Sequence, residues 1–523
     1  MATETVLLAD RDVGSTWSRV AAQAAIALAG ALFCGALVRA LVPNHDNAFH
    51  LDIAAQMLVG GRYFYDFMEI NPPLYSVLMI PVHGLRAVTG MDLYSAFIVW
   101  ISAFIVASST IVWNQLSECL DEGIAGRTVA VLCVEAVLFF MPGMDFGQRD
   151  HLAIVLILPS LPWLAIRKHG RAMTFGGAAI MATAGVGVLI KPFLLLAVGL
   201  PYLARMLDER NWRVVFERPV WILAGVAGVY VAVILIVFPE WLMVAKIGRV
   251  AYEAYDGPWL SRRIVLSAIV IVALALANEV LGRSNPRERR LGRMLASAAA
   301  GALASYVIQH KGIGYQLIPA MVTIALLTGF VVLVAVRWVA AITGADAVRR
   351  YRTLLVCIVA AVPLSSDFEK AVSDAGSIER SMRSLTAFMD AVHIGPRVIV
   401  FGASAYQAPL SIYRNSAMWI VPWIVRQQRA GRGDEPETLE IEAQLRTLVR
   451  DDFRRFRPDG IIVDVSPNQI TGLPPRFDML DWFRRDPEMA AMLDRYERIA
   501  TFKDPNERRW SFTDLVLYRR RQP

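Results

Sequence analysis

The sequence contains few charged residues and few cysteines for its length. Of its 523 residues, only 19% are Asp, Glu, Lys or Arg, 56% are hydrophobic, and the mean hydropathy is +0.45. A soluble globular protein carries roughly 25% charged residues, so this composition excludes an ordinary soluble multidomain protein. The four cysteines lack metal-ligand spacing and three of them lie in long apolar runs, which argues against a disulfide framework: Cys34, Cys119, Cys133 and Cys357. The sequence indicates an integral membrane protein.

Several other patterns are absent. We find no internal repeat, no low-complexity segment and no basic and aromatic pattern typical of nucleic-acid binding. The stretch FGASAYQ at 401–407 is not the GxGxxG motif of dinucleotide-binding folds. The first apolar run, about 20–42, is longer than a signal-peptide core and lacks a convincing cleavage site, so we expect a retained first transmembrane helix.

A spanning helix needs about 20 mostly apolar residues, although neighbouring helices can shelter shorter ones. Eleven segments meet this expectation: about 20–42, 92–116, 124–141, 151–166, 172–190, 193–204, 219–238, 264–281, 294–309, 315–336 and 353–366. The stretch 73–90 is apolar but short, and we interpret it as a helix at the membrane interface. If it crossed instead, the first loop would move to the cytoplasmic side.

The distribution of Lys and Arg orients these segments, because cytoplasmic loops retain positive charge. One set of loops holds 19 Lys and Arg in 77 residues, and the other holds 8 in 71. RKHGR at 167–171 and RSNPRERRLGR at 283–293 are therefore predicted to be cytoplasmic. The N-terminus is predicted to be cytoplasmic, and the segment after the eleventh span to be periplasmic.

From about residue 367 the sequence becomes charged, and short β-rich runs alternate with amphipathic stretches. Strands are predicted at 397–403, 459–465 and 514–518, and helices at 439–456 and 479–496. The predicted fold class is thus mainly α: a polytopic transmembrane helical bundle with juxtamembrane helices and a small C-terminal α/β domain. The predicted domains are 1–366, which includes the first periplasmic loop at 43–91, and 367–523.

Polar residues gather in the predicted outward loops, where a simple membrane anchor needs none. In 44–74, Asn44 or Asp46 can cap a helix lying on the membrane, and Glu69 and Asn71 follow in the loop. This helix is predicted from three apolar residues at four-residue spacing, Phe49, Ile53 and Met57. A helix cap is the alternative role for Asp46, and plain solvation is the alternative for Glu69.

A second cluster lies at 144–153, where the chain enters the membrane again. It contains Asp145, Arg149, Asp150 and His151. Such charges are costly at membrane depth unless they have a function or a partner, and a salt bridge that positions the loop is the alternative reading. Glu135, inside the preceding helix, needs a polar partner that the sequence does not identify.

A third set is rich in cations. It comprises Lys191, His310, Lys311, Tyr315, Tyr255, Arg262 and Arg263. Cations at the outer face oppose the orientation bias, and an anionic headgroup such as a phosphate or diphosphate explains them most simply. Anchoring to ordinary phospholipid is the alternative, especially for the two arginines.

These residues resemble the GT-C superfamily of membrane glycosyltransferases, especially the branch of protein O-mannosyltransferases and aminoarabinose-lipid A transferases. That pattern has an Asp after the first span, a juxtamembrane helix, a Pro-Pro-Leu segment and a second acidic residue, matched here by Asp46, 47–60, 72–74 and Asp150. The resemblance covers the order of elements over about 20–365. Because acidic pairs of the family are single acids here, we assign no metal, and bound Mg²⁺ or Mn²⁺ is not favoured.

The resemblance implies inverting transfer of a sugar from a polyprenyl-phosphate donor to an envelope polysaccharide, glycolipid or protein acceptor. Asp46 would be the general base and Asp150 the second catalytic carboxylate. Lys191, Lys311 and Arg149 would stabilise the leaving phosphate. Asp150 and Glu69 would bind sugar hydroxyls, orient those cations, or hold a metal if one is needed. The setting implied is the periplasmic face of a bacterial inner membrane. A transporter or lipid-linked glycan flippase is the alternative, and a mere anchor for the α/β domain ranks below both.

Overall fold

The computed structural model describes residues 21–41, 44–120, 124–167, 170, 172–253, 260–343, 346–402, 411–413, 417–467, 473–504 and 514–521. The chain divides into two compact units. The first comprises Met1–Ala40, Met91–Val231 and Gly257–Ala371, and the second comprises Leu41–Gly90, Ala232–Asp256 and Val372–Pro523. The first loop and residues 232–256 thus group with the C-terminal residues, whereas the sequence suggested a single boundary at 366/367.

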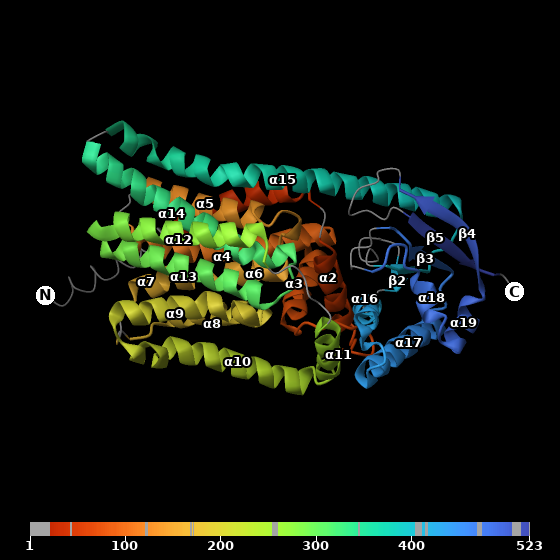
Figure 1. Ribbon diagram of the computed structural model, residues 1–523. Helices are drawn as coiled ribbons and strands as arrows, with labels where there is room; N and C mark the ends of the chain where they lie inside the picture. The colour runs from red at the N-terminus through yellow and green to blue at the C-terminus, as the bar shows by residue number, and fades with distance from the viewer. Residues whose placement is uncertain are drawn as a thin grey trace. The chain divides into compact units, whose positions relative to one another are not determined.

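The first unit is a helical bundle (Figure 1). After a helix at Ala21–Val38 it contains α4 (Leu93–Cys119), α5 (Ile124–Phe140), α6 (Arg149–Ile157), α7 (Ser160–Ile166), α8 (Phe175–Ile190), α9 (Leu195–Glu209), α12 (Arg262–Leu281), α13 (Pro286–Ile308) and α14 (Ile318–Thr343). Two of the boundaries between the units fall within helices, in α10 (Arg218–Val237) and in α15 (Asp346–Ala391). Short 3₁₀ turns lie at η1 (Gly143–Asp145), η2 (Pro192–Leu194), η3 (Trp212–Phe216), η4 (Gly282–Ser284) and η5 (Gly314–Leu317).

Helix α13 packs against α7, α9, α12 and α14. Its Ala- and Gly-rich sequence permits this, because small residues let helix backbones approach closely within a membrane. A Cβ atom placed on Gly301 would overlap the carbonyl oxygen of Leu196 in α9. The apolar runs therefore form a tightly packed bundle in which the ends of different helices are held together.

Seven helices among the described residues are long and apolar enough to cross a membrane: Ala21–Val38, Leu93–Cys119, Arg149–Ile166, Trp212–Val237, Arg262–Leu281, Pro286–Ile308 and Gly314–Thr343. Each matches one predicted span. The other four predicted spans are also helical, in the shorter α5, α8 and α9 and within α15. Helix α3 (Leu74–Thr89) has 16 residues, or roughly 24 Å, less than the roughly 30 Å hydrocarbon core.

The second unit contains a five-stranded sheet with the order β2-β1-β3-β5-β4. Its strands are β1 (Val398–Phe401), β2 (Ser411–Tyr413), β3 (Gly460–Asp464), β4 (Tyr496–Lys503) and β5 (Asp514–Arg520). The pairs β1–β2 and β1–β3 are parallel, whereas β3–β5 and β4–β5 are antiparallel. The mainly helical fold with a small C-terminal sheet is therefore confirmed, and two further strands join the three that were predicted.

Alternating side chains of β1 and β3 belong to two separate hydrophobic clusters, as the period of a strand requires. One cluster includes Val398 and Ile462, with Leu385 and Met389 of α15. The other cluster draws on α2 (His45–Leu58), α11 (Trp241–Glu253), α16 (Ala417–Gln427), α17 (Pro436–Phe456), α18 (Met479–Phe483) and α19 (Pro487–Leu493). Residues of the first loop thus share a core with the C-terminal sheet.

Two local predictions differ from the structure. The helix expected at 479–496 is split, because Asp486 caps a new helix by accepting from Met489 N at 2.9 Å and Pro487 follows at its first position. The chain then enters β4. The expected membrane-lying face of α2 packs instead into protein, where Phe49 and Ile53 are buried in the core.

Candidate functional site

The first predicted acid lies in the first turn of α2. Asn44 caps this helix, its side-chain oxygen accepting from Asp46 N at 2.7 Å. The Asp46 carboxylate is therefore not the cap, and it lies 3.3 Å from His45 Nε2. A carboxylate in the first helical turn is stabilised by the helix dipole. Asp46 remains partly exposed, with 20% of its side chain accessible.

Helices α2 and α3 meet through polar side chains that sequence reasoning missed. His50, which is buried, has its Nδ1 2.7 Å from Ser76 Oγ, and its ring lies edge-on to Tyr75 with centroids 4.7 Å apart. Tyr75 OH donates to Asn47 Oδ1 at 3.0 Å. The only sequence signal was the spacing of Asn47 and His50 on one face of a helix otherwise judged by its apolar residues.

Glu69 and Asn71 bind each other. The Glu69 carboxylate is buried and accepts from Asn71 N at 2.7 Å and from the Asn71 side-chain amide. The carbonyl oxygen of Asn71 in turn accepts from Trp241 Nε1 at 2.9 Å. These bonds fix the turn that precedes α3 and tie it to α11. The geometry of Glu69 is that of a residue that shapes the loop.

The second predicted acid begins α6. Gln148 caps that helix by accepting from Asp150 N at 3.1 Å, and Gly147, with φ +75°, donates its N–H to His151 Nδ1 at 2.9 Å. Arg149, Asp150 and His151 are all buried. A positive φ suits glycine, and a Cβ atom on Gly147 would also clash with a neighbouring aromatic ring. The turn thus directs three polar side chains into the bundle.

Three predicted residues from separate loops come together. Lys191 Nζ lies 3.4 Å from Asp150 Oδ2, and both side chains are buried. The same ammonium lies 5.9 Å from the centroid of the Tyr315 ring. Lys191 is placed here because Pro192 disfavours continuation of α8 beyond it, so the chain turns at this point. A buried lysine, a carboxylate and an aromatic face form the candidate site of the first unit.

The remaining predicted residues are more dispersed. His310 is exposed with φ +50°, and Lys311 is half-buried in the turn between α13 and α14. Arg262 and Arg263 are exposed at the start of α12. Among the described residues, the structure records no contact between these two arginines and the cluster around Lys191. Tyr255 lies outside the described residues.

A second buried ionic cluster was not predicted as such. Arg205 donates two hydrogen bonds to Glu217, each 3.0 Å, and Arg167 Nε lies 3.3 Å from the same carboxylate. In sequence these charges are ordinary residues at the predicted cytoplasmic ends of helices. Their fixed bidentate geometry indicates that they hold helix ends together.

Within the described parts of the chain, no three or more His, Cys, Asp or Glu side chains are grouped so as to hold a metal ion. No protein-family model matches the sequence, and no curated protein matches it either.

Proposed function

We propose that this protein is an integral membrane glycosyltransferase that uses a polyprenyl-phosphate-linked sugar. The acceptor would be an envelope polysaccharide, glycolipid or protein, and transfer would invert the anomeric centre. The observation that carries the proposal is the convergence of Asp150, Lys191 and Tyr315 from three separate loops. Together with the resemblance in the order of the motifs, this favours a site for an anionic headgroup and a sugar.

The chemistry follows from the charges. A lipid phosphate gains negative charge as it leaves, and a fixed ammonium in a partly dry site stabilises that charge more than water does. Lys191 fills this role, with Asp150 holding its ammonium in place. Arg149 and Lys311 are further cations for the same group. The ring of Tyr315 offers an aromatic face to a sugar or to the ammonium.

Asp46 is the proposed general base. Asn44 caps α2, so the Asp46 carboxylate does not serve as the helix cap, and it is partly open to solvent. It would take the proton of the acceptor hydroxyl or amine as this attacks the anomeric carbon. Asp150 is the second proposed catalytic carboxylate, and the reaction is proposed without a metal.

The proposed setting is a bacterial inner membrane. The proposal has eleven crossings, a cytoplasmic N-terminus and a periplasmic C-terminal domain, as the Lys and Arg distribution predicts. Sugars linked to lipid are the donors available outside the cytoplasm. The helix α3 is proposed to lie at the interface, consistent with its 16 residues.

The test uses the full-length protein in liposomes with a panel of polyprenyl-phosphate sugars and an envelope extract as acceptor. Asp46→Asn should lower turnover by about 100-fold or more, the usual contribution of a general base, while donor binding is retained. The matched control is Asp52→Asn on the same helix, whose carboxylate accepts from Gln56 Nε2 at 2.9 Å. Equal turnover in the two variants, or none with any donor in the wild type, would contradict the proposal.

One observation favours the alternative of a transporter or flippase. Glu135 is fully buried in α5, within a predicted span, and its carboxylate packs against Gly30 of the first helix. Ionisable residues at such depth often mark ion or substrate paths. A flippase should move a fluorescent lipid-linked sugar across proteoliposomes, and Glu135→Gln should abolish that movement. Glycosyl transfer that persists in Glu135→Gln would instead support the enzyme.

A further inference from the structure

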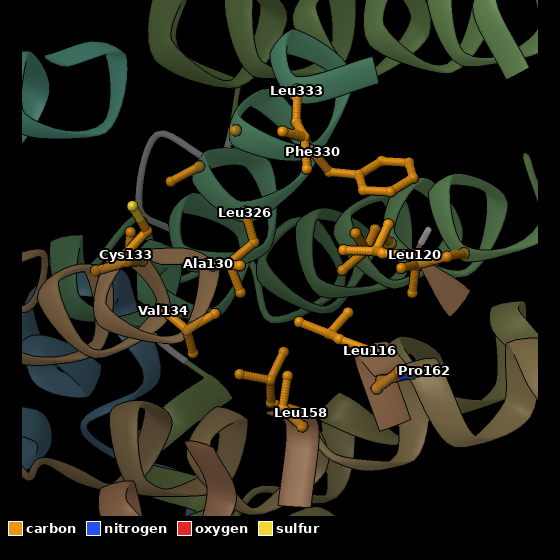
Figure 2. Close-up of a pocket in the computed structure, with 16 residues that line it drawn as sticks. Leu116, Leu120, Ala130, Cys133, Val134, Leu158, Pro162, Leu326, Phe330 and Leu333 are labelled. Atoms are coloured by element: carbon orange, nitrogen blue, oxygen red, sulfur yellow. The ribbon is translucent and has the colours of Figure 1, made fainter. Parts of the chain in front are cut away.

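The first unit contains an apolar cavity of about 100 Å³. Figure 2 shows side chains such as Leu116, Val134, Leu158 and Phe330 surrounding it. They come from α4, α5, α13 and α14 and from the region where α6 ends and α7 begins. Apart from the Cys133 thiol, every residue that lines the cavity is hydrocarbon or glycine.

Water is a poor occupant of this space. A buried water needs two to four polar partners, and the cavity is several times larger than the roughly 10–15 Å³ that one water requires. An empty cavity of this size would destabilise the bundle, since its lining loses dispersion contacts. Among predicted membrane-spanning helices, the abundant apolar molecule that can fill it is a lipid chain.

Two of the helices that line the cavity carry arginines just beyond one of its ends. On α5, the lining residues Ala130 and Val134 lie on the same helical face as Arg127, three residues before Ala130. On α13, Arg287 precedes the lining residue Leu291 by one turn. Arg287 Nη1 donates to the carbonyl oxygen of Glu118 at 3.3 Å, between the lining residues Leu116 and Leu120.

Other charged side chains of the described residues near this end are Arg337, Glu288 and Glu118. Glu288 is buried and pairs with Arg337, which lies one turn beyond the lining residue Leu333. The Glu118 carboxylate is exposed. For Arg127, the described part of the chain provides neither an ion pair nor a hydrogen bond to its Nε. Arg127 and Arg287 therefore offer positive charge to a further group.

We propose that the cavity binds one acyl chain of an anionic glycerophospholipid, whose headgroup lies against Arg127 and Arg287. Juxtamembrane basic residues attract anionic lipids, and basic pockets between helices bind their headgroups. Both arginines belong to segments predicted to be cytoplasmic, so the lipid would come from the cytoplasmic leaflet. This site is separate from Asp150 and Lys191 and does not depend on the proposed transfer reaction.

The first test titrates the delipidated full-length protein in detergent with dioleoylphosphatidylglycerol and with dioleoylphosphatidylethanolamine, and counts bound lipids by native mass spectrometry. The anionic lipid should bind at one saturable site, and Arg127→Gln with Arg287→Gln should weaken it about 25-fold, or about fivefold for each arginine. Arg283→Gln removes an exposed arginine of the same loop and should leave binding unchanged. Equal binding of both lipids, or an equal effect of Arg283→Gln, would overturn the proposal.

The second test locates the chain. In a variant with Cys133 as its only cysteine, phosphatidylglycerol should slow alkylation of Cys133 by N-ethylmaleimide, because the chain fills the space that the thiol lines. Ala130→Phe fills the cavity and should remove lipid binding, and Ala130→Leu serves if the larger residue prevents folding. Unchanged alkylation would refute a chain in the cavity. Stronger protection by a polyprenyl phosphate than by phosphatidylglycerol would assign the cavity to another lipid and overturn the proposal as stated.

Discussion

Replacing Lys191 with Met removes the positive partner of Asp150 while keeping a side chain of similar length. The two charges are 3.4 Å apart, and their side chains are only 9% and 1% exposed. With an effective dielectric constant of about 20, Coulomb's law gives about 5 kcal/mol at this distance. Breaking a buried pair costs about 3–5 kcal/mol, because one charge is left without its partner. We expect Lys191→Met and Asp150→Asn each to lose stability in this range.

The double variant separates an ion pair from two independent losses. Because it leaves no unpaired charge, Lys191→Met with Asp150→Asn should lose less than about 2 kcal/mol, so the coupling between the two sites is large. Unfolding in mixed detergent micelles measures these free energies. The control is Lys246→Met, which breaks a pair with Glu440 of similar length, 3.3 Å, but about half exposed, and should cost at most about 1 kcal/mol. Additive single effects, or equal costs for Lys191→Met and Lys246→Met, would refute the reasoning.

Two further substitutions test the packing and the capping of the bundle. Gly301→Ala should destabilise the protein by several kcal/mol because its Cβ overlaps the backbone of α9, whereas Gly225→Ala meets open space and should be neutral or stabilising in the same unfolding assay. The Ser95 hydroxyl, as the largest cause, lowers the pKa of Asp92 to about 2, and this carboxylate caps α4. Since that pKa lies below the unfolded value of about 3.9, the contribution of Asp92 is present above pH 4 and is lost as the pH falls towards 2. Asp92→Ala should therefore cost about 1 kcal/mol at pH 7 and less at pH 3 in that assay.

The helices of the first unit could be predicted because hydropathy is a local property. Each apolar run must satisfy its backbone hydrogen bonds internally, so a helix is the available structure. The proximity of Asp150 and Lys191 could also be predicted, since both lie at turns between long helices, and turns on the same side of the membrane can converge. The His50–Ser76 contact could not be predicted, because a single polar residue on a helix does not reveal which helix it faces. The same limit applies to Arg205 and Glu217, which read as solvated charges near helix ends.

The split of the expected helix at 479–496 has a different cause. The apolar spacing was correct for both pieces, but Asp486 and Pro487 form a helix start within the run. After Leu493 the residues suit a strand, and pairing with β5 decides the outcome. Pairing with a distant strand is not visible in a local pattern, so β4 was missed.

The spacing of Phe49, Ile53 and Met57 shows only that one face of α2 is apolar, and does not tell whether lipid or protein covers it. Residues more than 180 positions away in sequence cover the apolar face of α2, because Val244 and Ile247 of α11 belong to the same hydrophobic core as α2 and the C-terminal helices. The loop that carries Asp46 and Glu69 is further bound to α11, where a Cβ atom on Gly248 would lie 2.9 Å from Ile70 Cβ. The first loop should therefore depend on the C-terminal residues for its order.

Ile424→Asp tests this dependence in the full-length chain. Ile424 of α16 is fully buried in the shared core, and an unpaired charge there is strongly destabilising. Hydrogen exchange should become faster in α2 as well as in α16, although α2 is about 370 residues away in sequence. Leu439→Asp places the same charge on an exposed position of α17 and should leave α2 protected. If α2 kept its protection in Ile424→Asp, the first loop would be ordered independently of the C-terminal residues. A loss of activity on deleting the C-terminal domain would then reflect a role of that domain itself, and not the collapse of the loop that carries Asp46.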